Sequence, residues 1–195
     1  MKDPKTGEQK EVLVDRDCGV RPETTLESLG KLQPVFVKDG TGTTTAGNSS
    51  QITDGAAVIL LTRRDIAVKL GCKIYGRILS FAVAGVPPKI MGIGPAYAIP
   101  AALGKAGLSV NDIDIFEINE AFASQAAYCV KKLGVPKEKL NPRGGAIALG
   151  HPLGMTGARM IVTLFSELER TNKKRGIVSM CIGTGMGACG VFERE

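Results

Sequence analysis

Residues 141–159 read NPRGGAIALGHPLGMTGAR and hold the only histidine of the 195-residue sequence, His151. Glycines lie on both sides of this histidine, and an apolar helical pattern begins just after it, at about Thr156. Because glycine has no side chain, a ligand or another backbone segment can approach closely here. The free N–H groups of a helix start disfavour a nearby positive charge, so we expect a neutral His151 that can accept a proton. A histidine satisfied by backbone in a glycine-rich turn would give the same pattern.

The sequence on both sides of this stretch alternates between strand and helix patterns. Apolar or alternating runs predict strands at 73–84, 113–118, 145–149, 176–181 and 188–192. Helical patterns occur between them, at 95–106, 119–133 and about 156–170. This order predicts an α/β fold with a mixed five-stranded sheet that is covered by helices on both faces. A separate apolar run at 56–61 predicts one more buried strand.

The composition is that of a soluble globular protein, with 44% hydrophobic and 23% charged residues. The formal net charge of +6 is spread along the chain, so it suits a polyphosphate ligand such as a nucleotide or coenzyme A better than a nucleic acid. No apolar run is long enough to cross a membrane, and we expect no membrane partner and no signal peptide. The cysteines contain no C-x-x-C pair and predict neither a disulfide framework nor a metal site. They are Cys18, Cys72, Cys129, Cys181 and Cys189.

Three polar side chains stand at the ends of predicted strands, beside a glycine or a helix start. They are Asn119 (where the N-cap of a helix is expected), His151 and Cys181. If these strand ends meet, they place an amide, an imidazole and a thiol in one pocket. A cysteine–histidine pair allows nucleophilic catalysis or proton transfer, and the N–H groups after Cys181 could hold an anion. The alternative for Cys181 is a buried core thiol, which is common in proteins.

Several short motifs resemble those of the thiolase family. The segments NEAFA at 119–123, GHP at 150–152 and CIGTG at 181–185 match three family motifs in order and spacing. The segment TAGNSS at 45–50, together with DGA at 54–56, is similar to the family's coenzyme A-facing loop. The resemblance spans essentially the whole chain and is greatest to the peroxisomal 3-ketoacyl-CoA branch. It implies the thiolase-like fold, here as the second half of a duplicated domain pair.

The resemblance also implies a chemistry. The family reaction converts 3-ketoacyl-CoA and CoA into acetyl-CoA and a shortened acyl-CoA, in fatty acid β-oxidation. His151 would activate the acyl-accepting cysteine and offer its ring N–H to an oxyanion hole, which a water held by Asn119 completes. Cys181 would move the proton at the substrate α-carbon. The N–H of Gly183 would contribute to a second oxyanion hole.

Partners follow from the same resemblance. Coenzyme A is expected as a substrate that contacts Ser50 and Ala46, with no permanently bound cofactor. The family implies a homodimer and a peroxisomal location, with mitochondrial and cytoplasmic locations as alternatives.

The sequence departs from the family pattern in one important respect, because it resembles only the second half of a thiolase. Nothing in it matches the family's nucleophilic cysteine, and Cys18 has the wrong neighbours. We therefore expect residues 1–71 to be a remnant of the N-terminal domain and its loop region, and 72–195 to be the C-terminal domain. We expect the chain alone to be inactive. The alternative is a non-catalytic thiolase remnant that binds CoA or forms dimers.

Overall fold

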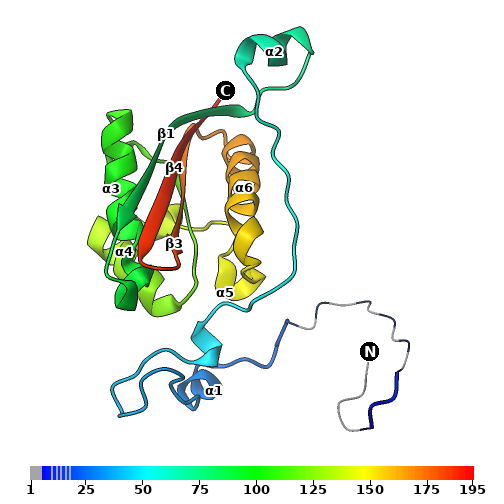
Figure 1. Ribbon diagram of the computed structural model, residues 1–195, viewed down its shortest axis with the longest axis vertical. Helices are drawn as coiled ribbons and strands as arrows, with labels where there is room; N and C mark the ends of the chain where they lie inside the picture. The colour runs from blue at the N-terminus through cyan, green and yellow to red at the C-terminus, as the bar shows by residue number, and fades with distance from the viewer. Residues whose placement is uncertain (1–5, 10, 12, 14, 16, 18) are drawn as a thin grey trace. The chain divides into compact units, whose positions relative to one another are not determined.

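The computed structural model describes residues 6–9, 11, 13, 15, 17 and 19–195 (Figure 1), so Cys18 lies outside the described residues. The chain divides into two compact units, Met1–Leu32 and Gln33–Glu195. The first contains one short helix, α1 (Leu26–Gly30), whose first turn is capped by Thr25. The second unit contains the sheet and all the motifs considered below.

The sheet of the second unit has four strands in the order β1-β4-β3-β2. These are β1 (Gly76–Gly85), β2 (Ile115–Ile118), β3 (Arg175–Ile182) and β4 (Met186–Arg194). Strands β2 and β3 are parallel, whereas β4 is antiparallel to both β3 and β1. The predicted mixed sheet is therefore confirmed, but the prediction of five strands is wrong for the described residues.

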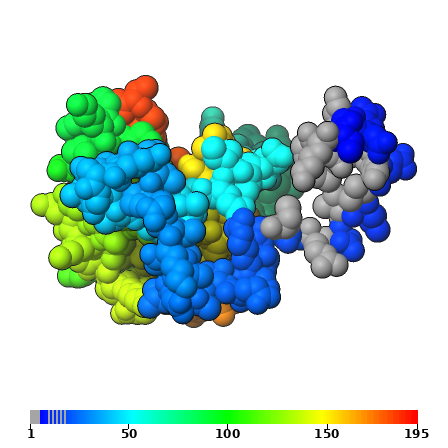
Figure 2. Space-filling model, turned by 90° about the horizontal axis from the view of Figure 1, so that it is seen from below, coloured from blue at the N-terminus to red at the C-terminus, as the bar shows by residue number. Residues whose placement is uncertain are grey.

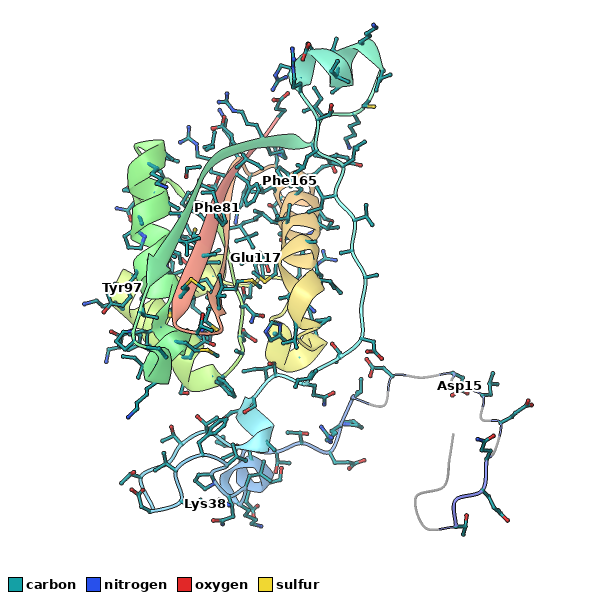
Figure 3. The ribbon with its side chains drawn as sticks, viewed as in Figure 1. Asp15, Lys38, Phe81, Tyr97, Glu117 and Phe165 are labelled. Atoms are coloured by element: carbon teal, nitrogen blue, oxygen red, sulfur yellow. The ribbon has the colours of Figure 1, made fainter. Side chains whose placement is uncertain are left out.

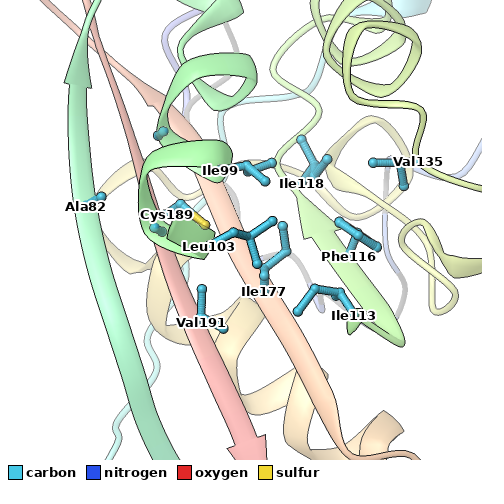
Figure 4. Close-up of a cluster of buried hydrophobic side chains, with 12 residues drawn as sticks. Ala82, Ile99, Leu103, Ile113, Phe116, Ile118, Val135, Ile177, Cys189 and Val191 are labelled. Carbon is cyan, nitrogen blue, oxygen red and sulfur yellow. The ribbon is translucent and has the colours of Figure 1, made fainter. Parts of the chain in front are cut away.

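Helices cover both faces of this sheet, as predicted (Figure 1). On one face, α3 (Pro95–Ala106) and α4 (Ala123–Leu133) pack over a cluster that includes Phe116, Ile118 and Ile177 (Figure 4). On the other face, α6 (Thr156–Arg170) packs against Ile115, Val178 and Phe192. Each fully buried side chain of this size contributes about 1.5–3 kcal/mol to stability. The remaining elements are the helices α2 (Arg64–Lys69) and α5 (Ala146–Leu149) and the 3₁₀ turns η1 (Ala46–Asn48), η2 (Pro88–Ile93), η3 (Val110–Asp112), η4 (Lys137–Lys139) and η5 (Leu153–Met155).

The missing fifth strand is the segment 145–149, which forms the short helix α5 instead. The carboxylate of Glu120 accepts a hydrogen bond from the Ile147 N–H at 3.3 Å, in the first turn of this helix. A carboxylate at a helix N-terminus accepts a hydrogen bond from a free N–H group and interacts favourably with the positive end of the helix dipole. Gly145 precedes the helix, and its missing side chain leaves the space that Glu120 occupies. A contact with a residue distant in sequence thus selects helix over strand.

The apolar run at 56–61 is also not a strand, and the prediction of burial there is wrong. Val58 is 89% exposed and Leu60 is 80% exposed, because no strand of the described chain pairs with this segment. The residues just before it pack against the C-terminal part of the same unit: Ile52 forms a parallel bridge with His151, and Gly55 lies close to Pro152. In Figure 2 the cyan residues around position 50 lie beside the yellow residues around position 150.

Candidate active site

Asn119 directly follows β2 and extends its pairing by one residue. Its N–H donates to the Ser179 carbonyl at 2.9 Å, and its side chain is buried. The predicted N-cap role is wrong, because the N-cap of α4 is Phe122. The side-chain amide of Asn119 is therefore not used by a helix, and its Nδ2 lies 3.3 Å from His151 Nε2.

His151 is held in the loop between α5 and η5 by backbone and side-chain contacts. Its N–H donates to the Gln51 carbonyl at 2.7 Å, and its Nδ1 lies 2.7 Å from Thr156 Oγ1. Gly150 has a φ of 86°, and a Cβ at this position would lie 2.5 Å from Thr53 Cγ2. Only glycine fits there on both grounds. The glycine before the histidine thus allows residues 51–53 to approach closely and to hold the backbone of His151 in place.

The imidazole is neutral, as predicted, but for a different reason. Burial is the main effect that lowers the pKa of His151 from its ordinary value, and the Arg159 guanidinium lowers it further. The predicted cause was the start of α6, which instead contributes the hydroxyl of Thr156. When Nε2 accepts from Asn119, the single proton of a neutral ring is on Nδ1 and is donated to Thr156 Oγ1. Nε2 then carries the lone pair that a proton acceptor needs.

Arg159 and Thr156 are site residues that our sequence analysis did not identify. Arg159 lies on the first turns of α6, and its Nη1 donates to the Gly150 carbonyl at 2.8 Å, which clamps the histidine loop. Thr156 is completely buried. Their positions three residues apart on a helix that follows the histidine are a usable signal, because such residues share one face.

Cys181 lies near the end of β3, paired with Gly187 of β4 and half-buried. Burial raises the pKa of its thiol, so the sulfur is protonated at neutral pH. It stands two residues beyond Ser179, the residue that binds the Asn119 N–H. The structure thus brings Asn119 and His151 into contact and places Cys181 on the adjacent strand. Among the described residues, no hydrogen bond joins Cys181 to His151 or Asn119.

Gly183 lies in the turn that joins β3 to β4. The next two residues, Thr184 and Gly185, have φ angles of 72° and 98°, so the chain reverses within residues 183–185. Gly183 is exposed, and a Cβ built on it would meet nothing within 4 Å. The glycine turn with a cysteine beside it was predicted and is confirmed.

The loop that carries Ser50 and Ala46 packs on the NEAF segment, residues 119–122. Ser50 donates twice to the Ala121 carbonyl, from its N–H at 3.0 Å and from its hydroxyl at 3.2 Å. Ser49 forms an antiparallel bridge with Phe122. Ala46 begins η1 and is exposed, while Thr45 caps this turn through the Gly47 N–H. Two motifs that are distant in sequence therefore form one surface.

Metal-ligating side chains do not cluster in the part of the chain that the structure describes. That part of the chain has no group of three or more histidine, cysteine or acidic side chains that could hold a metal ion. None of its helices combines the length and the apolar character needed to traverse a bilayer.

The similarity of this chain to known proteins extends over almost its whole length. The family described as "Thiolase, C-terminal domain" matches residues 72–194, and "Thiolase, N-terminal domain" matches residues 3–65. Peroxisomal 3-ketoacyl-CoA thiolase B of Rattus norvegicus is 69% identical over 188 residues, which are 96% of this chain and 44% of the rat protein. The human peroxisomal 3-ketoacyl-CoA thiolase is 66% identical over the same length, 44% of that protein. The chain thus spans less than half the length of these relatives.

Solved structures give the same result. The dimeric peroxisomal thiolase of Saccharomyces cerevisiae matches with a TM-score of 0.83 and 60% identity, over 90% of this chain and 44% of the yeast chain. The human mitochondrial 3-ketoacyl-CoA thiolase in complex with CoA matches with a TM-score of 0.86 and 46% identity, over 91% of this chain and 44% of that chain. Because its C-terminal domain, its motifs and its fold all match those of thiolases, the chain belongs to the thiolase family.

Proposed function

We propose that this chain carries the proton-transfer half of a thiolase active site, for thiolytic cleavage of 3-ketoacyl-CoA to acetyl-CoA and a shortened acyl-CoA. The observation that carries the proposal is the contact between His151 and Asn119, with a neutral imidazole whose Nε2 is ready to accept a proton. The family matches at 3–65 and 72–194 support the division into an N-terminal part, 1–71, and a C-terminal domain, 72–195.

The first covalent step needs an acyl-accepting cysteine, for which the sequence has no matching motif. That thiol gives its proton to His151 and attacks the 3-keto carbon, and the bond between the α- and β-carbons breaks. Cys181 is protonated at neutral pH, so its thiol can deliver the proton that turns the leaving enolate into acetyl-CoA. The protonated ring of His151 and a water on Asn119 stabilise the enolate oxygen.

In the second step, CoA attacks the acyl group on that cysteine. The CoA thiol returns a proton to the Cys181 thiolate, and the departing cysteine takes its proton back from His151. The N–H of Gly183, in its open turn, stabilises the carbonyl oxygen of this acyl transfer. Both side chains end in the state in which they began, so the protons balance over one turnover.

Coenzyme A binds at the surface formed by residues 45–50 and the NEAF segment in this proposal. Ser50 contacts the pantetheine arm, and Ala46 lies exposed on the same loop. The human mitochondrial relative was solved in complex with CoA, which supports CoA as the ligand. The yeast relative is described as dimeric and the rat and human relatives as peroxisomal. We extend both properties, a homodimer and a peroxisomal location, to this protein.

The test measures thiolysis of acetoacetyl-CoA by the purified chain, alone and mixed with a separately produced N-terminal half of a peroxisomal relative. We expect no turnover alone and turnover in the mixture. His151→Ala and Cys181→Ala should each abolish it, whereas Cys72→Ala, at an exposed thiol, should not.

Three results would contradict parts of the proposal. Turnover by the chain alone that is lost in Cys18→Ala would make Cys18 the acyl acceptor. Equal activity of Cys181→Ala and Cys72→Ala would remove Cys181 from the mechanism. CoA binding that is lost in Ser50→Ala but unchanged in His151→Ala, with no turnover in any mixture, would favour the non-catalytic alternative.

A further inference from the structure

Three buried side-chain oxygen atoms have no hydrogen-bond partner among the described residues: Thr53 Oγ1, Glu117 Oε1 and Asn119 Oδ1. The last two belong to residues that are only 3% and 2% exposed. Successive strand residues point to opposite faces, and Ile115 packs against α6, so Glu117 and Asn119 also point to the α6 face. Figure 3 shows Glu117 between the sheet and α6. A buried polar atom without a partner costs about 1–3 kcal/mol, so these two atoms call for an explanation.

Glu117 and Asn119 line the same small cavity. It has a volume of about 10 Å³ and is also bordered by Asn141, Gly145 and Arg159. A buried water needs at least about 10–15 Å³ and two to four polar partners, so this cavity has room for one water at most. Glu117 Oε1 and Asn119 Oδ1 supply two such partners. Size and chemistry both fit a single water that bridges the two side chains.

The charges around Glu117 come from α6 and from the segment just after β2. Burial raises the pKa of its carboxyl to about 8, against the opposing effect of Arg159 on α6. Glu167, also on α6, and Glu120, just after β2, raise it further. Glu167 is itself paired with Arg143 and Arg170. Glu117 is therefore a neutral acid at pH 7, with one O–H to donate.

One water in this cavity would complete a hydrogen-bond chain with one direction. It would accept from the Glu117 O–H and donate to Asn119 Oδ1. Asn119 Nδ2 then donates to His151 Nε2 at 3.3 Å, and His151 Nδ1 donates to Thr156 Oγ1 at 2.7 Å. If the amide of Asn119 turned over, an oxygen would face Nε2 and the opposite tautomer of His151 would be favoured.

We propose that Glu117 is a positioning residue, which fixes the side-chain amide of Asn119 through one buried water and thereby sets the tautomer of His151. The residue touches no reacting atom. Its kinetic effect rests on the proposed function, but its effect on the imidazole is measurable in the chain itself.

The test uses NMR of the His151 ring, whose signals are unique because the chain has one histidine. The ring is titrated from about pH 5 to 9 in the wild type, Glu117→Gln and Glu117→Leu. The wild type should show two steps, its own protonation at low pH and a second step near pH 8 as Glu117 ionises. Glu117→Gln, a neutral hydrogen-bonding replacement, should keep the ring shifts at pH 6–7 and lose the second step.

Glu117→Leu removes the hydrogen bond and fills the cavity. It should move the ring shifts at every pH and raise the pKa of His151 toward its ordinary value, because the amide is then free to present its oxygen. In the complemented thiolase assay, Glu117→Leu should lose about tenfold in kcat with KM unchanged, and Glu117→Gln should stay within about twofold. Glu167→Gln is the control, because Glu167 lies outside the cavity: it should leave the ring shifts at pH 6–7 unchanged, and it should only move the second step to lower pH, since Glu167 raises the pKa of Glu117.

Two outcomes would overturn the inference. One is a Glu117→Leu variant whose ring shifts and pKa equal those of the wild type. The other is a Glu117→Gln variant as perturbed as Glu117→Leu, since this would mean that an ionised carboxylate is needed. If Glu117→Leu fails to fold, the comparison of the wild type with Glu117→Gln still tests the inference: the step near pH 8 must be present in the wild type and absent in Glu117→Gln. Coupling seen by NMR without turnover in any mixture would refute the proposed function and leave this inference standing.

Discussion

Glu120 and Gly145 show how closely single residues fit around the candidate site. The Glu120 carboxylate accepts from Asn141 Nδ2 at 3.0 Å and from the Ile147 N–H at 3.3 Å. It lies directly over the Cα of Gly145, where a side chain would occupy the same space. The glycine before α5 thus serves the packing of a neighbouring carboxylate rather than an unusual backbone angle.

Gly145→Ala should therefore destabilise the protein by about 1–3 kcal/mol, because the added methyl group displaces Glu120 from both partners. The matched control is Gly104→Ala in α3, where a Cβ meets nothing within 4 Å. That substitution should stabilise the protein by about 0.5–1 kcal/mol through helix propensity. Urea unfolding of the two variants checks the prediction, and equal effects would show that Glu120 moves aside at no cost.

Among the elements, β2 depends on a side chain to complete it. It is an edge strand of four residues that pairs only with β3 within the sheet. Asn141 covers the free edge: its Oδ1 accepts from the Ile118 N–H and its Nδ2 donates to the Ile118 carbonyl, both at 2.9 Å. Its own N–H donates to the Phe116 carbonyl at 2.8 Å. One asparagine therefore makes the hydrogen bonds that a neighbouring strand would make.

Asn141→Ala should cost about 2–3 kcal/mol of stability, because two buried backbone groups of Ile118 lose their partner. The control is Asn172→Ala, since Asn172 also has a positive φ, 51° against 41° for Asn141, but is exposed. Both variants place alanine at a positive φ, and Asn172→Ala loses only an exposed hydrogen bond from Arg194 Nη2, so the buried edge contacts should give Asn141→Ala the lower urea midpoint. Because β2 leads into Asn119, only Asn141→Ala should also shift the His151 NMR signals. Equal midpoints would contradict this role.

The sequence alone predicts correctly those helices and strands that are determined by residues close to one another in the chain. Helix α3 ends at Ala106, as predicted, and Gly107 after it adopts a left-handed cap; α6 spans the predicted residues because its apolar pattern is long. The four-residue segment AIAL at 146–149 was not predictable in this way, since its state depends on Glu120. For the site, the end of β2 identified Asn119, whereas only the GHP motif identified His151, because the strand predicted before this histidine is helix α5. The contributions of Glu117 and Arg159 arise only when α6 packs on β2.

At the scale of the molecule, the described chain exposes several large apolar side chains outside its closed core, and the run at 56–61 contains some of the most exposed ones. The clusters on the two faces of the sheet are buried, whereas the run at 56–61 is extended and has no strand partner in the described chain. Val58, Leu60 and Leu61 are 89%, 80% and 70% exposed. An exposed apolar segment whose backbone groups are unpaired can pair with another chain as an edge strand does.

We therefore expect the purified chain to self-associate as its concentration rises. Replacing both Val58 and Leu60 by lysine should suppress this, because charges on a strand oppose edge-to-edge pairing. The free energy of unfolding should change by less than about 0.5 kcal/mol, since both side chains are exposed in the folded chain. Sedimentation velocity over a range of concentrations measures the association. Val162→Lys on α6, where the apolar side chain is 50% exposed, is the control, since a helix face cannot extend a sheet. Equal suppression by this control, or none by the double variant, would place the association elsewhere on the surface.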